Sequence, residues 1–497
     1  MATFHLLNFG CRASQADGAA LKRQLLEAGL EEVASAAESQ VAVLNTCTVT
    51  ATADAEVRQI VRRIHRVNPH CRILVTGCYA QRAPQEVAQL PGVAWVVGNS
   101  HRHLIAKVLA RCKESEVSPS ADGQESEEQG PRPLVQTEEG VPTSALLHPA
   151  ADHTGPGESG VTAEGLPQLL VGEIGESFHF APAFPDDRTR PTLKVQDGCN
   201  ARCAFCVIPR VRGRSRSLAP EKVIEQIHDL AQSGYQEIVL CGINLGSYGK
   251  DLDRRLTLRG LLERILAETS IARVRLSSIE VMDVSPELIR LVAREPRLAE
   301  HFHIPLQSGC DRILRLMNRR YWAAQYAERL RAIHEQIPHC GIGADVMVGF
   351  PGETDEDHRA NLRFIASLPF TYLHVFPYSA RPGTPAAARP GQLNGRVIRE
   401  RGQEIRRLMA EKRQAFLADQ INRTLSVLTL ADTFAEARLA LSSNYLKVAL
   451  PFSALPANVL LEVCVGRVEN ETLYAYPELQ NRAPESPSVP GSTSSSS

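Results

Sequence analysis

Three cysteines that lie close together in the chain have the spacing of a metal-binding loop. Cys199, Cys203 and Cys206 are separated by three and two residues in Asp197-Gly-Cys-Asn-Ala-Arg-Cys-Ala-Phe-Cys206. A structural zinc site usually takes four protein ligands, and no fourth Cys or His stands near this loop. Three thiolates can instead hold a [4Fe–4S] cluster and leave one iron open to a substrate. We therefore expect such a cluster; zinc with a distant fourth ligand is the alternative.

A second set of three cysteines, Cys11, Cys47 and Cys78, is spread over the N-terminal part of the chain. Each follows a predicted strand by two residues, and the carboxyl ends of parallel strands share one edge of a sheet, where ligands bind. We expect these thiols to lie together and to surround a second cluster, although three unrelated buried cysteines would give the same pattern. The remaining cysteines are interpreted as small hydrophobic residues: Cys71, Cys112, Cys241, Cys310, Cys340 and Cys464.

The elements that position the second set alternate between strand and helix over residues 1–112. This alternation predicts a doubly wound parallel α/β sheet. The predicted strands are Phe4–Phe9, Val41–Asn45, Arg72–Thr76 and Val93–Val97, and the predicted helices are Ser14–Ala28, Ala53–Arg66, Pro84–Leu90 and His101–Arg111.

Residues 188–414 repeat the alternation on a longer scale and predict a partial β/α barrel, whose functional residues should gather at the carboxyl ends of its strands. A charged helix is expected at Arg396–Leu417, and the pattern of residues 415–480 predicts a small all-β barrel. The strands expected in the partial barrel are Thr192–Gln196, Glu237–Cys241, Val274–Ser277, His303–Leu306, Gly343–Val348 and Leu373–Phe376.

The formal net charge of −1 hides an uneven distribution. Residues 113–187 carry 15 acidic and 2 basic side chains, whereas the net charge is +4 for residues 1–112 and +8 for residues 188–497. The neutral total therefore does not exclude a nucleic-acid partner, which requires excess Lys and Arg. High charge and low hydrophobicity predict that most of 113–187 is a disordered acidic insert, with a small acidic domain as the alternative; the Ser-rich tail 481–497 is also expected to be disordered.

The N-terminus shows no basic region followed by an apolar run, and no apolar stretch approaches the length of a membrane span. We therefore expect a cytoplasmic protein with no membrane contact. In that reducing compartment, clustered cysteines bind metal more often than they form disulfides.

The cysteine patterns resemble those of a known group of enzymes. The Cys199–Cys206 loop is similar to that of radical S-adenosylmethionine (SAM) enzymes, and the N-terminal cysteines, in Asn45-Thr-Cys-Thr-Val-Thr50 and Val75-Thr-Gly-Cys-Tyr-Ala-Gln81, resemble those of the methylthiotransferases. The resemblance covers nearly all of residues 1–112 and 188–478, and the long acidic insert departs from it. Longer strings resemble the threonylcarbamoyladenosine tRNA methylthiotransferases: Leu240–Gly249, His303–Gly309, Met317–Tyr321, Gly343–Thr354 and His374–Ser379.

This resemblance implies two [4Fe–4S] clusters, one on each set of three cysteines. It implies that the cluster on Cys199, Cys203 and Cys206 reduces SAM, and that the resulting 5′-deoxyadenosyl radical abstracts hydrogen from C2 of an adenine. The cluster on the N-terminal cysteines would deliver sulfur, and a second SAM the methyl group. The implied substrate is N6-threonylcarbamoyladenosine in the tRNA anticodon loop, and the implied partners are an electron donor such as flavodoxin or ferredoxin and a sulfur source.

Other functions stay open at this point. Isopentenyladenosine in tRNA or an aspartate of a ribosomal protein is an alternative substrate. A non-catalytic iron–sulfur protein that binds RNA is the alternative from another class. No residue is assigned as a catalytic acid or base.

Polar residues and glycines at predicted strand ends are candidates for binding SAM, although each could equally satisfy loop backbone groups. A basic run at Ile208–Arg216 is a candidate for gripping RNA phosphate, with a solvated loop as the alternative. In the C-terminal region, which the resemblance identifies as a TRAM-like RNA-binding domain, Asn444–Lys447 and Arg467 are candidates for RNA contact. The SAM-binding candidates are Gly242, Asn244, Ser277, Glu280, Gln307 and Gly349.

Overall fold

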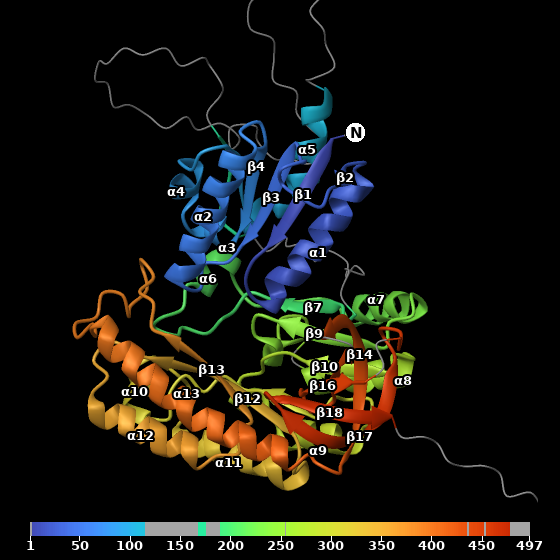
Figure 1. Ribbon diagram of the computed structural model, residues 1–497. Coiled ribbons are helices and arrows are strands. Elements are labelled where there is room, and N and C mark those ends of the chain that lie inside the picture. Colours follow the sequence, from blue (N-terminus) through green and yellow to red (C-terminus); the bar gives the residue numbers. More distant parts are fainter. Residues whose placement is uncertain are drawn as a thin grey trace, which may run out of the picture. The chain divides into compact units, whose positions relative to one another are not determined.

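The computed structural model describes residues 2–114, 167–174, 189–253, 255–434, 437–451 and 454–477. The chain divides into two compact units, residues 1–413 and 414–497. The first unit contains an N-terminal parallel sheet and a partial β/α barrel, and the second contains a small β-barrel (Figure 1). The mixed α/β fold class expected from the sequence is confirmed.

The N-terminal sheet is parallel throughout, in the order β2-β1-β3-β4-β5-β6. Its strands are β1 (Thr3–Asn8), β2 (Glu31–Glu32), β3 (Val41–Thr46), β4 (Arg72–Gly77), β5 (Val93–Gly98) and β6 (Gln168–Leu170). The helices along it are α1 (Arg12–Glu27), α2 (Ala51–Val67), α3 (Cys78–Arg82), α4 (Pro84–Ala88) and α5 (Ile105–Glu114), with a 3-10 turn, η1 (Asn99–Leu104), before α5.

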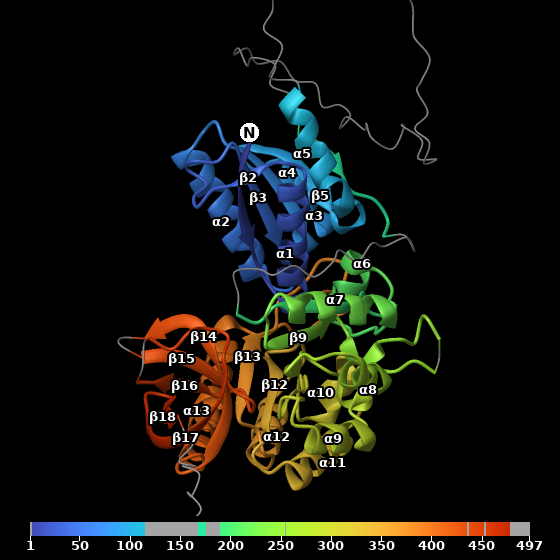
Figure 2. The same ribbon diagram turned by 90° about the vertical axis from the view of Figure 1, so that its right-hand side faces the viewer.

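Both faces of this sheet are covered, because successive side chains of a strand point to opposite faces. In β3, Val43 packs in the cluster that contains Leu21 of α1 and Ile105 of α5. Its neighbour Leu44 packs in the cluster that contains Val57 of α2 and Tyr79 of α3. The doubly wound arrangement follows from this alternation, and the views in Figures 1 and 2 show helices on both sides of the strands.

Strand β6 lies inside the segment expected to be mostly disordered. Gln168–Leu170 pairs in parallel with β5, with Trp95 opposite Gln168. The strand belongs to a short apolar run, Leu169-Leu170-Val171, that the acidic composition of residues 113–187 outweighs when the segment is averaged. Helix α5 also extends into this segment, to Glu114. The prediction for residues 115–166 and 175–187, and that for the tail 481–497, lies outside the described residues.

The partial barrel contains six parallel strands, as expected. One sheet has the order β10-β9-β7-β8 and the other β11-β12-β13, and a bridge between Ser278 and His303 connects β10 to β11. The short β8 is antiparallel to β7. The strands are β7 (Thr192–Asp197), β8 (Arg216–Ser217), β9 (Glu237–Gly242), β10 (Arg273–Leu276), β11 (His301–His303), β12 (Gly341–Val348) and β13 (Tyr372–Pro377).

Helices surround these strands and bury a single apolar core against them. Strand β11 ends at His303 rather than Leu306, although the amides of Ile304 and Leu306 still donate to β12, at Gly343 O (2.8 Å) and Asp345 O (3.1 Å). The helices are α6 (Ile208–Arg212), α7 (Pro220–Gln232), α8 (Leu258–Glu268), α9 (Pro286–Arg294), α10 (Asp311–Leu316), α11 (Ala323–Gln336), α12 (Asp355–Ala366) and α13 (Gly395–Ala418), with 3-10 turns η3 (Leu245–Ser247) and η4 (Val281–Asp283).

The second unit is a closed β-barrel in the order β14-β15-β16-β18-β17. Strand β15 was not expected from the sequence, and closure needs it between β14 and β16. Of the helices the structure describes, none is both long and apolar enough to cross a membrane. The strands are β14 (Thr424–Phe434), β15 (Ala437–Ser442), β16 (Lys447–Leu450), β17 (Leu460–Glu469) and β18 (Thr472–Pro477).

Candidate active site

The Cys199–Cys206 loop leaves the carboxyl end of β7 through a tight turn. Gly198 has φ +71°, and a Cβ there would lie 1.9 Å from the carbonyl oxygen of Arg214, so the turn requires glycine. The Cys199 amide donates to Gly213 O at 3.0 Å, and the Ala204 amide donates to Met317 O at 2.9 Å. Backbone contacts at both ends therefore fix the loop against the rest of the barrel.

The sulfur atoms of Cys199, Cys203 and Cys206 do not all lie within 4.8 Å of one another. Among the described residues, a different group of three ligating side chains meets that distance, namely His303, Asp345 and His374.

The three thiols of this loop are half-buried. Burial raises the pKa of Cys206 to about 12, and the neighbouring Cys203 and Cys199 raise it further, while backbone hydrogen bonding at Ile208 opposes the shift. Burial likewise raises the pKa of Cys199. Thiolates are disfavoured here unless a cation compensates them, which fits a metal centre and not an exposed nucleophile.

Polar side chains from three barrel segments surround the sulfur atoms. Arg319 Nη1 donates to Cys203 Sγ at 3.3 Å and also pairs with Glu280. Asn244 Nδ2 lies 3.9 Å from Cys199 Sγ. A cavity of about 370 Å³ opens on this side of the loop, and Cys203, Asn244, Glu280 and Arg319 are among its lining residues.

The structure also brings the N-terminal cysteines together. They follow β1, β3 and β4, and Cys47 is buried with its pKa raised to about 12, by burial first and then by the neighbouring thiols of Cys78 and Cys11. Gly10 has φ +101°, and a Cβ there would lie 2.9 Å from Cys47 Sγ. The chain thus packs closely around Cys47, whereas Cys11 is exposed. The three thiols meet where the shared edge of a parallel sheet was expected to bring them.

A buried ion network joins the two sets of cysteines. Cys78 packs against Val207 and Val211, which follow Cys206 in the chain. Arg212 Nε donates to Cys78 Sγ at 3.3 Å, and the same guanidinium pairs with Asp197 of β7 at 3.1 Å and with Asp17 of α1 at 2.9 Å. Lys194 of β7 also contacts both carboxylates.

Every charged group in this network is nearly excluded from solvent, with side-chain exposures of 7% or less for Lys194, Asp197, Asp17 and Arg212. Burial alone would raise the pKa of Asp17, but the charges of Arg102, Lys194 and Arg212 hold it well below its usual range. The carboxylates therefore stay ionised and fix the N-terminal sheet to the barrel next to both sets of cysteines.

A second buried contact connects the N-terminal sheet to the loop after β13. Arg381 Nη1 pairs with Asp54 of α2 and donates to Thr48 O at 3.2 Å. Asp54 also pairs with Arg82, at 3.0 Å. These contacts place the segment that follows Cys47 against the barrel.

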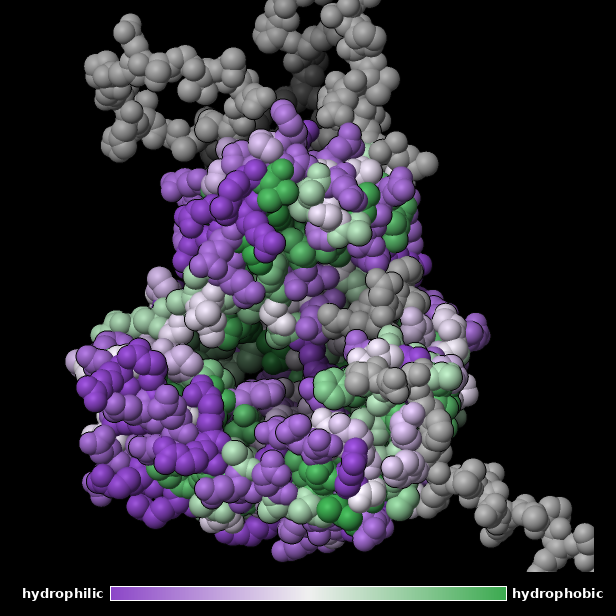
Figure 3. Space-filling model, viewed as in Figure 1, coloured by the Kyte–Doolittle hydropathy of each residue, from purple (hydrophilic) through white to green (hydrophobic). Residues whose placement is uncertain are grey.

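Between these contacts lies a second cavity, of about 430 Å³. Cys206 lines it from the radical-SAM-type loop, Val49 and Thr50 from the segment after Cys47, and Gln307 from the segment after β11. Figure 3 shows a hollow with green, apolar side chains in its lining below the N-terminal sheet. Further lining residues are Phe205, Val207, Ile208, Asp345, Met347, His374, Phe376, Pro377 and Ser379.

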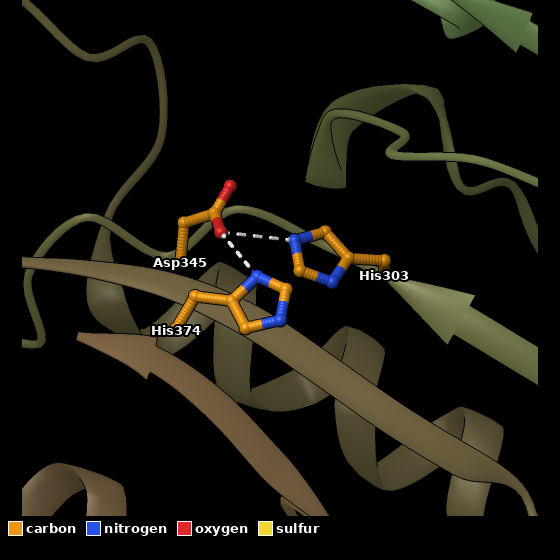
Figure 4. A group of neighbouring side chains, drawn as sticks. All are labelled: His303, Asp345 and His374. Carbon is orange, nitrogen blue, oxygen red and sulfur yellow. Dashed lines mark hydrogen bonds and ion pairs between the residues drawn. The ribbon is translucent and has the colours of Figure 1, made fainter. Parts of the chain in front are cut away.

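A polar group at this cavity was missed by the sequence-based search for site residues. Asp345 Oδ1 lies 3.2 Å from His303 Nε2 and 3.3 Å from His374 Nδ1, and Figure 4 shows both imidazoles turned toward this carboxylate. The donor atoms of the three side chains are close enough to hold a metal ion. All three residues lie in sequence segments that resemble the methylthiotransferases, which is the only indication of them in the sequence. The pairing of β11, β12 and β13 shows that they meet.

Three of the residues expected to bind SAM carry buried polar atoms without a partner. Asn244 Oδ1, Ser277 Oγ and Gln307 Oε1 are buried and make no hydrogen bond in the described part of the chain. Gln307 also has φ +62°, a conformation that is uncommon for a residue other than glycine. Buried polar groups are normally satisfied, so each of these atoms is a candidate to hydrogen-bond a ligand; Asn244 lines the first cavity and Gln307 the second.

The other three residues expected to bind SAM, Glu280, Gly242 and Gly349, make contacts with other parts of the protein. Glu280 pairs with Arg319 at the first cavity. A Cβ at Gly242 would lie 2.8 Å from Gln196 Oε1, so this glycine permits close packing behind the loop. Gly349 has φ +78°, and its amide donates to Glu353 Oε2 at 3.0 Å, as in a barrel-corner turn.

The structure corrects two expectations about RNA contact. Arg212 belongs to the basic run Ile208–Arg216, but it is only 2% exposed and is bound in the ion network, because two carboxylates and a thiol surround it. Arg210 and Arg214 of the same run are exposed. Asn444 is buried and donates to Gln420 Oε1, so it has no face for RNA, whereas the exposed Arg467 lies over the ring of Tyr474.

Comparison with known proteins places this geometry in a family. The model of the Radical SAM superfamily matches residues 193–365, and that of the Uncharacterized protein family UPF0004 matches residues 3–98. A solved structure of the radical S-adenosylmethionine methyltransferase TsrM from Kitasatospora setae has a TM-score of 0.52 at 16% identity, over 78% of this chain and 77% of that one. This likeness shows the shared fold.

Relatives of similar length carry methylthiotransferase names. The "Threonylcarbamoyladenosine tRNA methylthiotransferase MtaB" of Aquifex aeolicus (strain VF5) is 35% identical, over 88% of this chain and 94% of the relative. The protein of the same name from Bacillus subtilis (strain 168) is 34% identical over 90% of both chains. The "tRNA-2-methylthio-N(6)-dimethylallyladenosine synthase" of Pelotomaculum thermopropionicum is 31% identical over 86% of both chains. At this identity and coverage, the chain belongs to the radical SAM methylthiotransferase family.

Proposed function

We propose that this protein converts N6-threonylcarbamoyladenosine in the anticodon loop of tRNA to its 2-methylthio derivative. The observation that carries the proposal is one cavity that is lined both by the Cys199–Cys206 loop and by the segment that follows Cys47. Cys206 lines that cavity directly, and Val49 and Thr50 line it from the segment that follows Cys47. The names of the MtaB relatives support the substrate.

Cys199, Cys203 and Cys206 are the proposed ligands of the cluster that binds SAM. When bound, that cluster supplies the electron that cleaves SAM and releases a 5′-deoxyadenosyl radical. Asn244, Ser277 and Gln307 would hydrogen-bond SAM, since each has a buried polar atom without a partner. Arg319 would hold Cys203 through its bond to the sulfur and, by pairing with Glu280, keep that carboxylate oriented at the first cavity.

Cys11, Cys47 and Cys78 are the proposed ligands of a second [4Fe–4S] cluster, which would be the site of sulfur delivery. Arg212 supports this site because its guanidinium donates to Cys78 Sγ while Asp17 and Asp197 hold it in place. A hydrogen bond to a ligand sulfur stabilises the reduced form of a cluster. The same residue would therefore set both the position and the potential of the second site.

The adenine would enter the cavity of about 430 Å³, which is large enough for a modified base. Its mostly apolar walls exclude water from a radical reaction. The exposed Arg467 and the half-buried Tyr474 of the C-terminal barrel would contribute tRNA contacts in a TRAM-like domain. The reaction also requires a one-electron donor, such as flavodoxin or ferredoxin, and a sulfur source, and we place it in the cytoplasm with its tRNA substrate.

A reconstitution experiment tests the two cysteine sites separately. The protein, with its iron and sulfide restored, is mixed with SAM, a reductant and tRNA that carries threonylcarbamoyladenosine, and products are measured by mass spectrometry. Wild type is expected to form both 5′-deoxyadenosine and the methylthiolated nucleoside. Cys203→Ala should form neither, whereas Cys47→Ala should still form 5′-deoxyadenosine but no methylthiolated product. Full product formation by Cys47→Ala would refute the role of the second site.

A further inference from the structure

Asp345 and His374 line the cavity that we assign to the adenine, and His303 contacts Asp345. We propose that His374, oriented by Asp345, hydrogen-bonds the polar substituent on N6 of the substrate and thereby selects an acylated adenosine over one with an apolar alkenyl group. The inference rests on the proposed function and names the feature of the substrate that this cavity recognises.

The geometry of His374 leaves one ring nitrogen for a ligand. Its Nδ1 lies 3.3 Å from Asp345 Oδ1, and its Nε2 makes no hydrogen bond within the part of the chain that the structure describes. The side chain is 64% exposed although both His374 and Asp345 line the cavity. A neutral imidazole with its Nδ1–H on a carboxylate presents Nε2 as an acceptor, and a protonated one presents it as a donor.

Asp345 is held firmly enough to orient this imidazole. It stands opposite His374 in the register of β12 and β13, and it also lies 3.2 Å from His303 Nε2. His303 Nδ1 in turn lies 3.0 Å from the Tyr372 hydroxyl, which also bonds His301 Nε2 at 2.8 Å. Although burial opposes ionisation, the hydrogen bonds from both histidines keep the pKa of Asp345 well below its usual range.

The other walls make this polar group selective. Val49, Phe205, Met347 and Phe376 present apolar side chains to the same cavity. C2 of adenine and C6, which carries N6, flank N1 in the six-membered ring, so a base whose C2 faces the cysteines brings its N6 substituent to a neighbouring wall. A threonylcarbamoyl group offers N–H, hydroxyl and carboxylate partners for His374 Nε2, whereas a dimethylallyl group offers that nitrogen none.

The test compares substrates rather than activity alone. Wild type, His374→Phe and His374→Gln are reconstituted and given tRNA that carries either threonylcarbamoyladenosine or dimethylallyladenosine, and kcat/KM is measured for each. His374→Phe is expected to lower kcat/KM for the threonylcarbamoyl substrate by roughly 10- to 100-fold, the effect of one lost hydrogen bond to a polar or charged group. His374→Phe should also lower the ratio of kcat/KM for the threonylcarbamoyl substrate to kcat/KM for the dimethylallyl substrate by at least the same factor. His374→Gln, which keeps a polar side chain, should restore part of this ratio.

The matched control is His334→Phe, which changes an exposed histidine on α11 and should alter neither constant. Equal iron content and equal basal 5′-deoxyadenosine formation establish that His374→Phe has kept its clusters. If wild type modifies the threonylcarbamoyl substrate and His374→Phe shows the same substrate ratio, the inference is wrong and the proposed function stands. If wild type modifies neither tRNA, the proposed function itself fails.

Metal analysis distinguishes a hydrogen-bonding group from a cation site. We expect wild type to contain iron and no further stoichiometric divalent metal. One equivalent of zinc or manganese that is lost in both His374→Phe and Asp345→Asn would assign the three side chains to a metal ion and overturn the proposal.

Discussion

At the scale of single residues, Arg212 combines three roles that depend on its burial. It contacts a cysteine of the N-terminal sheet, a carboxylate of α1 and a carboxylate of β7. Burial alone would lower its pKa, but the charges of Cys78, Asp197 and Asp17 raise it well above the usual value, so the guanidinium is always charged. Two ionised carboxylates in a dry interior need such a cation.

Replacing Arg212 by methionine should destabilise the protein by roughly 3–5 kcal/mol, because it removes an ion pair from each of the buried carboxylates of Asp17 and Asp197. The variant should also bind less iron, since Cys78 loses its donor. Chemical denaturation and iron content measure these effects. Arg210→Met, in the same helix but exposed, is the control and should change stability by less than about 0.5 kcal/mol. Equal stability of the two variants would contradict the assigned role.

Glu237, at the start of β9, is a second buried charge whose effect depends on pH. Arg273 Nε lies 2.7 Å and Arg275 Nε 2.8 Å from its carboxylate, and all three side chains are at most 2% exposed. Although burial opposes the shift, Arg275 and Arg273 lower the pKa of Glu237 from 4.5 to about 2. Its contribution to stability is therefore complete above pH 4.5 and is lost as the pH falls toward 2.

The prediction is that Glu237→Gln lowers the free energy of unfolding near neutral pH by roughly 3–5 kcal/mol. Because the variant has no carboxylate to protonate, it should also lose less stability than wild type between pH 4.5 and pH 3.5. Urea denaturation at several pH values measures both effects. Glu263→Gln, on the exposed side of α8, should leave the wild-type profile unchanged. Parallel profiles for wild type and Glu237→Gln would exclude the ionised buried carboxylate.

At the scale of the elements, the cysteine sites were predictable because parallel topology follows from the alternation of strand and helix. That topology places the carboxyl ends of the strands at one edge of the sheet, so the sequence alone predicted that Cys11, Cys47 and Cys78 lie close together. The meeting of Asp345 with His303 and His374 was not predictable. It depends on the register between β11, β12 and β13, and the pattern of apolar residues does not fix that register when strands are buried on both faces.

The burial of Arg212 escaped prediction for a related reason. A run of arginines after a loop is usually solvated, and only the packing of α6 against the N-terminal sheet turns one of them inward. Likewise β6 follows a long acidic segment, and its three residues acquire structure only by pairing with β5. Contacts between distant segments, rather than local sequence, decide these features.

The cysteine loop itself gives a prediction at this scale. Gly198→Ala should prevent the loop from closing, because its Cβ would lie 1.9 Å from a backbone oxygen that cannot move independently. We expect loss of the cluster on Cys199, Cys203 and Cys206, seen as reduced iron content and no SAM cleavage. Gly234→Ala is the matched control, since Gly234 also has positive φ, +88°, but has no atom within 4 Å of a built Cβ. If Gly198→Ala binds as much iron as the control, the turn is not required.

At the scale of the whole molecule, the sequence joins basic segments to an acidic insert. Residues 1–112 carry a net charge of +4, and residues 188–497, which include the C-terminal barrel, carry +8. The insert between them, residues 113–187, has 15 acidic side chains. A tRNA partner is attracted by the first two and repelled by the third. The insert is therefore expected to weaken tRNA binding in a salt-dependent way.

Deleting residues 121–160 tests this expectation and spares β6, which begins at Gln168. The deletion removes eight acidic and one basic residue, so it should tighten tRNA binding at low salt, with the difference decreasing as salt screens the charges. A neutral Gly/Ser linker of the same length in place of 121–160 is the control for chain length and should bind like the deletion. Identical affinities for wild type and both variants across the salt titration would show that the insert does not compete with RNA.

The central claim is that the two cysteine sites together place a methylthio group on threonylcarbamoyladenosine in tRNA. The most direct test is the nucleoside profile of tRNA from a strain that lacks this activity and carries the wild-type gene, Cys47→Ala or Cys203→Ala. The account predicts 2-methylthio-N6-threonylcarbamoyladenosine with the wild-type gene and only the unthiolated nucleoside with either variant. Unthiolated threonylcarbamoyladenosine in all three strains, or the methylthiolated form with either variant, would contradict it.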